Sequence, residues 1–416
     1  MAKLSEILRE RGYVHQFSSK KLEEITDAGT RTVYLGIDPT ADSLHVGSLM
    51  GLLVLRHFLE AGHTVIILTG GGTGMIGDPG GKSEERNLLD EETVARNTTA
   101  VARQIRQIFG RSDFIEENNA TWLSKLDLLS FLRDVGKHFT VNAMIKKDIV
   151  SERLKKESPI SYTEFSYSLL QAYDFAHLNE VHNCDIQVGG SDQWSNIIAG
   201  VEFIRRTQDT EAYALTWPLL VNKSTGKKFG KSEAGAVWLD SAKTSVFDFY
   251  QFWFNVEDEI VQECLLKMTL LSMKEIEAVM VMQKRDKGER HAQRLLARAV
   301  TALVHGNEEA ERAEAVSSVL FGGASVADLS DAEQLELQKS APTLTVGVGE
   351  NIIDVLMFSQ LAKSKREARQ FLVGNAVSLN GQPVDDESYS IEEKDFLGRV
   401  AILRRGKKNL CVLVQK

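Results

Sequence analysis

The chain has 416 residues, of which 43% are hydrophobic and 26% are charged, and its formal net charge is −9. Because a single core rarely grows beyond roughly 250–300 residues, we expect two or three domains, and the apolar content excludes a mostly disordered chain. The acidic balance excludes a protein that coats nucleic acid over its whole surface, but leaves room for a local basic patch.

Signals for export, membrane insertion and metal binding are missing from the sequence. The first residues, MAKLSEILRERGYV, hold no apolar segment typical of a signal peptide, and no run of about 18 apolar residues predicts a membrane span. The three cysteines, Cys184, Cys264 and Cys411, lie far apart without metal-ligand spacing. We expect a cytoplasmic protein with free thiols, no membrane association and no dedicated metal site.

Residues 33–70 read as a strand, a helix and a second strand. VYLGID (33–38) and TVIILTG (64–70) are short apolar runs, and apolar residues recur at helical spacing from His45 to Ala61, where Gly62 ends the pattern. Strand, helix and strand with short connections predict a βαβ unit and a parallel sheet. DIQVGG (185–190) is expected to add another strand.

The segment between the first strand and the helix is a candidate phosphate site. A helix N-terminus offers unpaired N–H groups and a partial positive charge, both of which suit phosphate. His45 and Thr40 can donate to phosphate oxygens, and Gly47 has no side chain to block a flat ligand. The alternative is an ordinary N-terminal cap made by Ser43 or Asp42.

A glycine pattern after the second strand, Gly72 to Gly77, matches the dinucleotide-binding G-x-G-x-x-G. That fingerprint needs a helix at its third glycine, but Asp78-Pro79-Gly80-Gly81 follows and cannot form a helix interior. We therefore set aside a nicotinamide oxidoreductase. The glycines are better explained by close approach of the backbone to a ligand at the carboxyl end of a strand.

A polar stripe marks the expected helix 165–178. Tyr167, Gln171 and Asp174 fall at i, i+4 and i+7, on one face. The pairs Tyr34 with Asp38 and Thr73 with Asp78, and the turn 189–194, place further polar groups at strand ends. Either the stripe is a solvated face or it is the wall of a polar pocket that suits a zwitterion carrying a phenol.

The stretch 216–235 is polar and rich in glycine and lysine, which predicts a mobile loop. It contains Lys227-Lys228-Phe229-Gly230-Lys231-Ser232. Two lysines three residues apart on a glycine-hinged loop can close over a triphosphate and follow its developing charge. The alternative is a solvated basic turn.

The rest of the chain divides into a helical region and a compact C-terminal unit. Helical patterns dominate 246–320, 336–349 reads as a linker, and basic residues cluster in 350–416. The cluster predicts either a solvated surface or a phosphate-binding face. Its members are Lys363, Lys365, Arg366, Arg369, Arg404, Arg405, Lys407 and Lys408.

Taken together, the two motifs resemble the HIGH and KMSKS signatures of class I aminoacyl-tRNA synthetases. Here they read His45-Val46-Gly47-Ser48 and Lys228-Phe229-Gly230-Lys231-Ser232, with Ser48 where histidine is usual. The whole chain resembles the bacterial tyrosyl-tRNA synthetases. The matching segments are YLGIDPTADSLHVG, IGDPGGKSEER, FLRDVGKHFTVN, FSYSLLQAYDF and GGSDQW, and 359–384 resembles the S4 RNA-binding domain around its turn 377–381.

The resemblance implies a role for each matching residue. Tyr34 and Asp174 should bind the tyrosine phenol, Asp78, Tyr167 and Gln171 its ammonium, and Gln193 should lie near its carboxylate, with Thr73 in the same pocket. Asp192 should bind the ATP ribose, and Lys82 and Arg86 the pyrophosphate. The implied ATP site comprises Gly36, Asp38, His45, Gly47, Ser48, Gly190, Asp192, Lys228, Lys231 and Ser232. The implied catalytic groups are Thr40, His45, Lys82, Arg86, Lys228 and Lys231.

The interpretation is an α/β protein with a Rossmann-like parallel-sheet catalytic domain, then an α-helical domain and a small α+β S4-like domain. The expected boundaries are 1–222, a mobile loop region 223–245, 246–335, a linker 336–349, and 350–416. The resemblance implies a tyrosine–tRNA ligase that uses ATP with Mg²⁺, acts on tRNA(Tyr) and forms a homodimer. Rivals are a tryptophan-charging enzyme, which Asp174 and Tyr34 disfavour, and an RNA-binding regulator with an inactive core, which Lys228 and Lys231 disfavour.

Overall fold

The computed structural model describes all residues except 1, 79–88, 111–112, 222–228, 233–234 and 407. The chain divides into two compact units, which we describe separately. The first unit comprises 1–244 and 256–292, and the second comprises 245–255 and 293–416. This division differs from the expected helical domain 246–335, because 256–292 groups with the first unit.

The described residues of the first unit form a six-stranded sheet in the order β1-β6-β5-β2-β3-β4. All neighbouring pairs are parallel except β1 with β6, which confirms the expected parallel sheet. The strand order runs outward from β2 in both directions, so the switch point of this topology lies between β2 and β5. The strands are β1 (Gln16–Phe17), β2 (Thr32–Ile37), β3 (Thr64–Thr69), β4 (Ile115–Asn118), β5 (Cys184–Gly190) and β6 (Tyr213–Trp217).

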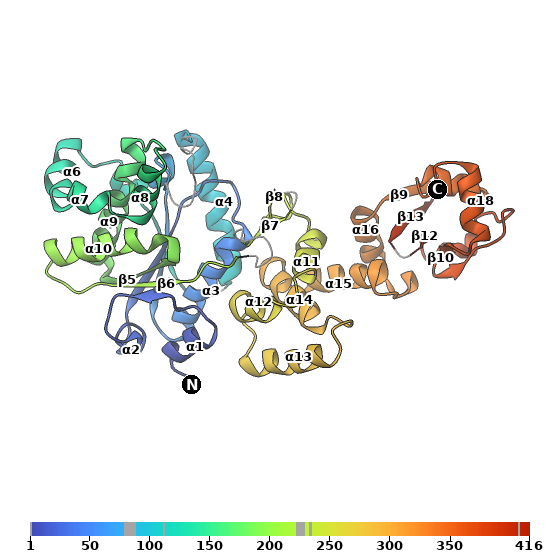
Figure 1. Cartoon of the computed structure of the whole chain (residues 1–416), viewed down its shortest axis with the longest axis horizontal. Helices are drawn as coiled ribbons and strands as arrows, with labels where there is room; N and C mark the ends of the chain where they lie inside the picture. Colours follow the sequence, from blue (N-terminus) through green and yellow to red (C-terminus); the bar gives the residue numbers. More distant parts are fainter. Residues whose placement is uncertain (1, 79–88, 111–112, 222–228, 233–234, 407) are drawn as a thin grey trace. The chain divides into compact units, whose positions relative to one another are not determined.

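Helices cover both faces of this sheet, with α3 and α4 on one side and α9 and α10 on the other (Figure 1). Apolar side chains of β2, β3 and α9 share one core, which includes Ile66, Leu68 and Phe175. The helices of the unit are α1 (Leu4–Glu10), α2 (Leu22–Thr26), α3 (Val46–Glu60), α4 (Glu91–Phe109), α5 (Ala120–Leu123), α6 (Leu128–Asp134), α7 (Val141–Met144), α8 (Asp148–Lys155), α9 (Tyr162–His182), α10 (Trp194–Thr207), α12 (Val261–Met268) and α13 (Met273–Arg285).

The predicted loop region 223–245 is more regular than expected where it is described. Lys231–Ser232 (β7) and Gly235–Ala236 (β8) form an antiparallel hairpin. The chain beyond it lies against the start of α3, where the Val46 N–H donates to the Val237 carbonyl at 3.0 Å. Composition alone predicted an irregular loop. It could not reveal these backbone hydrogen bonds, because they join segments far apart in the sequence.

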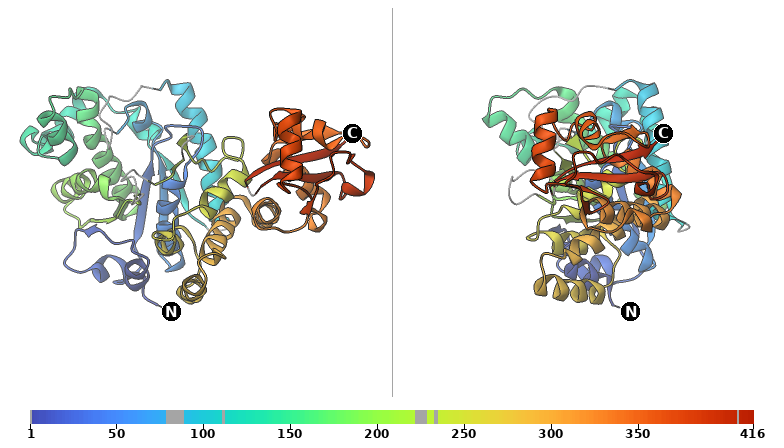
Figure 2. Two further views of the ribbon diagram at one scale, coloured as in Figure 1. Left: turned by 45° about the vertical axis from the view of Figure 1, so that its right-hand side comes forward. Right: turned by 90° about the vertical axis from the view of Figure 1, so that its right-hand side faces the viewer.

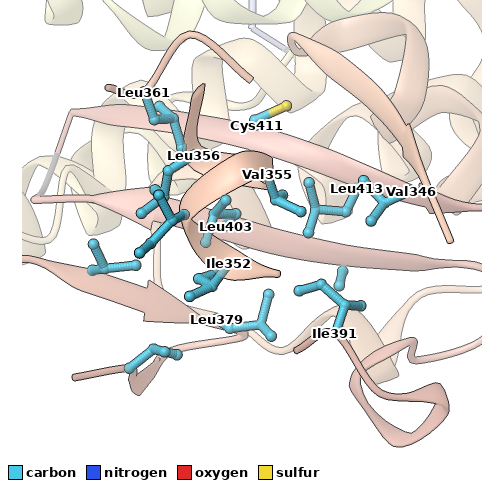
Figure 3. Close-up of a cluster of buried hydrophobic side chains, with 14 of the residues drawn as sticks. Val346, Ile352, Val355, Leu356, Leu361, Leu379, Ile391, Leu403, Cys411 and Leu413 are labelled. Carbon is cyan, nitrogen blue, oxygen red and sulfur yellow. The ribbon is translucent and has the colours of Figure 1, made fainter. Parts of the chain in front are cut away.

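The second unit is built around a five-stranded sheet of described residues in the order β11-β10-β12-β13-β9. One face packs on α17 and α18, in a core that includes Ile352, Leu356, Leu403 and Leu413 (Figure 3). Its elements are α11 (Val246–Phe254), α14 (His291–His305, whose first two residues group with the first unit), α15 (Asn307–Phe321), α16 (Asp331–Ser340), β9 (Thr343–Val346), α17 (Ile352–Phe358), α18 (Lys365–Val373), β10 (Val377–Leu379), β11 (Gln382–Pro383), β12 (Val400–Arg405) and β13 (Asn409–Gln415).

The other face of this sheet is also apolar and is covered by helices that precede it in the chain (Figure 2). Val400, Ile402 and Val412 pack with Phe247 of α11 and Val316 of α15. Residues 336–349 are consequently not a linker, since they hold the end of α16 and strand β9, which pairs in parallel with β13. Their polar composition obscured both elements.

No helix within the described parts of the chain is long and apolar enough to cross a membrane. Cys184, Cys264 and Cys411 are buried free thiols. Burial raises the pKa of the Cys184 thiol well above its usual range, and of Cys264 to about 12, so both remain protonated at neutral pH.

Candidate active site

A cavity of about 320 Å³ opens at the switch point of the parallel sheet. It brings together most residues predicted for tyrosine and ATP from segments far apart in the sequence. These residues are Tyr34, Gly36, Asp38, Thr40, His45, Gly47, Ser48, Thr73, Asp78, Tyr167, Gln171, Asp174, Gly190 and Gln193. An adjoining cavity of about 360 Å³ shares His45, Gly47 and Ser48 and adds Asp192, Phe229 and Gly230.

The inner end of the cavity is polar although it is buried. The Asp174 carboxylate accepts hydrogen bonds from Trp122 Nε1 at 2.7 Å and from Asn119 Nδ2 at 2.8 Å. Burial raises the pKa of Asp174 to about 7, and these two donors counteract the rise. The Tyr34 hydroxyl, on a side chain only 1% exposed, has no hydrogen-bond partner among the described groups. A buried hydroxyl in that state indicates a polar ligand.

Gln187 strengthens this indication. It pairs with Tyr34 across β2 and β5, lines the same cavity, and its Oε1 also lacks a hydrogen-bond partner among the described groups. Two unsatisfied polar atoms on adjacent strands beside a carboxylate can hold a hydroxyl group and fix its direction. Gln187 was not predicted from sequence, because a glutamine inside an apolar strand carries no motif.

Asn119 is the second residue that sequence reasoning missed. It is 1% exposed, and its Nδ2 donates to Asp174 and to Thr73 Oγ1, while its Oδ1 accepts from the Gly72 N–H at 2.7 Å. Asn119 thus orients the Asp174 carboxylate and the glycine turn after β3 together. Its position directly after β4 was the available signal, because polar groups at strand carboxyl ends meet at one edge of a parallel sheet.

Asp38 continues this polar network. It accepts from Thr73 Oγ1 and from the Tyr167 hydroxyl, each at 2.7 Å. Burial raises the pKa of Tyr167 well above its usual range, so its hydroxyl remains a donor. A Cβ on Gly70 would lie 2.0 Å from Asp38 Oδ1, so close packing explains a glycine at this position.

Asp78 also lines the cavity, where it accepts from Gln193 Nε2 at 2.6 Å and from Asn196 Nδ2 at 3.5 Å. Asp78 and Gln193 were predicted to meet the ammonium and the carboxylate of one amino acid. Their direct hydrogen bond shows that the two positions are adjacent. Asn196, which is buried on α10, was not predicted.

His45 caps α3 itself, and neither Ser43 nor Asp42 does. Its Nδ1 accepts from the Gly47 N–H at 3.0 Å, so in the neutral ring the proton lies on Nε2. The Ser43 hydroxyl instead donates to the Leu44 carbonyl. Asp42 forms an ion pair with Lys243 at 2.7 Å. Gly47 is required here, because a Cβ would lie 2.7 Å from the His45 ring.

The second motif is described only in part. Lys228 lies outside the described residues, and Lys231 and Ser232 are described only by their backbone in β7. Lys82 and Arg86, which belong to neither motif, also lie outside the described residues. Gly230 has φ +100°, and a Cβ there would lie 2.7 Å from Val46 Cγ2. The hairpin that holds Lys231 therefore begins in direct contact with the first turn of α3, next to His45.

The basic residues of the second unit fall into two groups, and Lys407 lies outside the described residues. Arg404 donates to the Val319 and Leu320 carbonyls at the end of α15, and Arg405 donates to the Leu361 carbonyl. These two arginines do not form the solvated face that their charge suggested. Lys363, Lys365, Arg366, Arg369 and Lys408 are exposed, and ion pairs join Lys365 to Asp354 and Arg369 to Glu387.

The chain is similar to known proteins over almost its whole length. Residues 26–322 match the family model described as tRNA synthetases class I (W and Y), and 332–413 match the tyrosine–tRNA ligase SYY-like C-terminal domain. The chain is 46% identical to the tyrosine–tRNA ligase of Roseiflexus castenholzii and 44% identical to that of Escherichia fergusonii, over 98% of each chain.

A solved structure shows the same fold. The C-terminally truncated mitochondrial tyrosyl-tRNA synthetase of Aspergillus nidulans aligns with a TM-score of 0.70 at 29% sequence identity. The alignment covers 77% of the present chain and 95% of that protein.

Proposed function

The chain belongs to the tyrosine–tRNA ligase family of class I aminoacyl-tRNA synthetases, and we propose how its residues carry out that activity. The enzyme activates L-tyrosine with ATP and transfers the tyrosyl group to the 3′ end of tRNA(Tyr). One observation supports the residue assignment above the others. A single cavity joins a polar buried end at Tyr34 and Asp174 to the N-terminus of α3 at His45 and Gly47.

Tyrosine binds with its phenol at the inner end. The substrate hydroxyl donates to Asp174 and accepts from the Tyr34 hydroxyl, which satisfies the buried group that otherwise lacks a partner. Asp78, Tyr167 and Gln171 hold the ammonium group, with Thr73 behind them, and Gln193 lies near the carboxylate. The amino acid then spans the cavity with its carboxylate toward α3.

ATP binds over the first turn of α3. Gly36, Asp38, Gly190 and Asp192 surround its adenosine part, and the phosphates lie at the helix N-terminus, where the helix dipole is positive and Gly47 leaves room. Ser48, with a shorter reach than the usual histidine, lines both cavities. Thr40, His45, Lys82, Arg86, Lys228, Lys231 and Ser232 contact the phosphates.

Activation is an in-line displacement at the α-phosphorus. A tyrosine carboxylate oxygen forms the new P–O bond, and the bond to the β-phosphate oxygen breaks and releases pyrophosphate. No covalent enzyme intermediate is needed, so positioning and charge stabilisation by His45 and the lysines supply the rate enhancement. A ribose hydroxyl of the tRNA then attacks the tyrosyl carbonyl, and AMP leaves.

In this scheme Mg²⁺ binds together with ATP. The described residues contain no group of three or more His, Cys, Asp or Glu side chains that could hold a metal ion. When bound with ATP, Mg²⁺ would offset phosphate charge, while the residues of the chain align the reacting atoms.

The partners extend beyond the cavity. We assign tRNA binding to the exposed Lys363, Lys365, Arg366, Arg369 and Lys408 together with Lys407, and we place the enzyme in the cytoplasm. We also propose a homodimer, supported by apolar side chains exposed on one segment of the first unit, including Leu128 at 68%, Leu129 at 74% and Tyr162 at 72%.

Light scattering tests the dimer. The wild-type mass should be about twice the 46.3 kDa of one chain, and Leu129→Asp should lower it. Leu335→Asp, which changes an exposed leucine of the second unit, should leave the mass unchanged. A wild-type mass of one chain would refute the dimer.

Tyrosine-dependent exchange of labelled pyrophosphate into ATP tests the activity itself. Exchange should require tyrosine and should be far slower with phenylalanine or tryptophan. The absence of exchange with tyrosine, or an equal rate with tryptophan, would contradict the assignment.

A further inference from the structure

Trp238 lies beside His45 although it belongs to neither motif. The Val46 N–H donates to the Val237 carbonyl at 3.0 Å, and the Leu239 N–H donates to the Leu44 carbonyl at 2.8 Å. These bonds place His45 and Trp238 opposite each other in an isolated antiparallel bridge. The segment after the β7–β8 hairpin is thus joined to the loop that leads into α3.

The side chains of this pair also meet. The centroids of the His45 and Trp238 rings are 6.3 Å apart, with the planes at 61°, an edge-to-face arrangement. The Nδ1 atom of the His45 ring also accepts a hydrogen bond from the Gly47 N–H. Trp238 and Gly47 therefore restrict the ring together.

Trp238 is itself fixed from two directions. Its backbone N–H donates to Thr244 Oγ1 at 3.0 Å, which fixes the main chain, and Lys243 Nζ lies 5.5 Å from its ring centroid. Lys243 also pairs with Asp42 at 2.7 Å, three residues before His45. A tryptophan held in this way can maintain the orientation of a neighbouring ring. It also lines the cavity that holds the predicted tyrosine and ATP residues.

We propose that Trp238 is a positioning residue for tyrosine activation, which acts by fixing the His45 ring. Lys231 lies seven residues earlier, at the start of the same hairpin, so Trp238 also joins the lysine motif to the histidine motif through one short segment. This inference rests on the proposed function, because it assumes that His45 contacts the phosphates of ATP.

A double-mutant cycle on pyrophosphate exchange tests the proposal. Trp238→Ala should lower kcat about tenfold with little change in the KM for tyrosine, since contacting residues commonly couple by this amount. In a His45→Ala background the same substitution should lower kcat by less than about twofold, because the ring that Trp238 positions is absent. Trp238→Phe, which keeps an aromatic edge, should retain kcat within about threefold of wild type.

A Tyr34→Phe background supplies the control, because Tyr34 lies at the tyrosine end of the cavity. In that background Trp238→Ala should again lower kcat about tenfold, because the free-energy effects of independent sites are additive. Trp238→Leu replaces the alanine variant in the cycle if that variant does not fold. An equal loss in the His45→Ala background, or a loss confined to the tyrosine KM, would overturn the proposal. Failure of the function itself would show separately, as absent exchange in the wild-type enzyme.

Discussion

At the scale of single residues, the tyrosine end of the cavity is distinguished by polar groups that the free protein leaves incompletely satisfied. Tyr34 and Gln187 each present a buried atom without a hydrogen-bond partner among the described groups, and Asp174 is a buried carboxylate. Each arrangement costs stability in the free protein and becomes favourable when a phenol binds. Stability and substrate affinity should therefore respond in opposite directions when these groups are changed.

Tyr34→Phe should show this opposition. Removing an unsatisfied buried hydroxyl should leave the ligand-free protein as stable as wild type or about 1 kcal/mol more stable. Loss of the hydrogen bond should weaken tyrosine binding about tenfold and reduce the preference over phenylalanine, a rule for which tyrosine-selecting synthetases are themselves the standard example. Chemical unfolding and tyrosine titration measure the two effects. A destabilised variant with unchanged tyrosine affinity would show that the hydroxyl is structural.

Asp174 predicts a pH dependence of stability. Its pKa rises from 3.8 to about 7 on folding, chiefly through burial. The native state therefore binds the Asp174 proton more tightly than the unfolded state does, and this tighter binding stabilises the fold. The stabilisation is present below about pH 4 and is lost as the pH rises to 7. The free energy of unfolding of the ligand-free wild type should fall relative to Asp174→Asn over that interval. Parallel profiles for the two proteins would contradict the raised pKa.

Some residues of the site could be predicted from the sequence, and others could not. Tyr34, Asp174 and His45 lie in recognisable local patterns, a strand end or one face of a helix. Asn119, Trp122 and Gln187 come from separate positions that carry no motif, so their roles emerge only when the sheet brings them to Asp174 and Tyr34. The cap of α3 was predicted from residue preference, which favoured Ser43 and Asp42 over the histidine that folds back onto Gly47.

At the scale of elements, the two short motifs meet because the hairpin β7–β8 begins at the N-terminus of α3. Gly230 packs on Val46, and the segment after the hairpin pairs with the residues around His45. Local patterns predicted β2, α3 and β3 correctly, since each is a single periodic run. They did not predict this hairpin, because its contacts are made over long sequence separation.

Gly230→Ala tests that contact. The substitution places a Cβ 2.7 Å from Val46 Cγ2 and should lower the kcat of tyrosine activation about tenfold or more, with the KM for tyrosine nearly unchanged. Gly235→Ala is a matched control, because Gly235 also has positive φ, +117°, but a Cβ there meets no described atom within 4 Å. Equal losses in the two variants would attribute the effect to backbone strain and would contradict the role of the contact.

At the scale of the whole molecule, sequence patterns gave the order of the domains but not their boundaries. The S4-like sheet shares its second face with α11 and α15, so its core extends well before residue 350. A chain truncated at 350 would remove the strands that cover Phe247 and Val316 and that pair with β9. Surface substitutions are therefore a cleaner way than truncation to separate tRNA binding from tyrosine activation.

Replacing Lys363, Arg366 and Lys408 together by serine should weaken tRNA binding and make it less dependent on salt. The slope of log affinity against log salt concentration should fall by about one for each phosphate that is no longer neutralised. Pyrophosphate exchange should be unchanged, because these exposed residues belong to the second unit. Lys394→Ser, which removes a lysine paired with Glu392, is the control and should leave charging unchanged. An unaltered KM for tRNA in the triple variant would place the RNA-binding face elsewhere.

The central claim is that one cavity holds the phenol at Tyr34 and the phosphates at His45. Steady-state pyrophosphate exchange for Tyr34→Phe and His45→Ala tests it most directly. Tyr34→Phe should raise the KM for tyrosine and leave the KM for ATP unchanged, whereas His45→Ala should lower kcat and leave the KM for tyrosine unchanged. The reverse pattern, or the same pattern in both variants, would contradict the account.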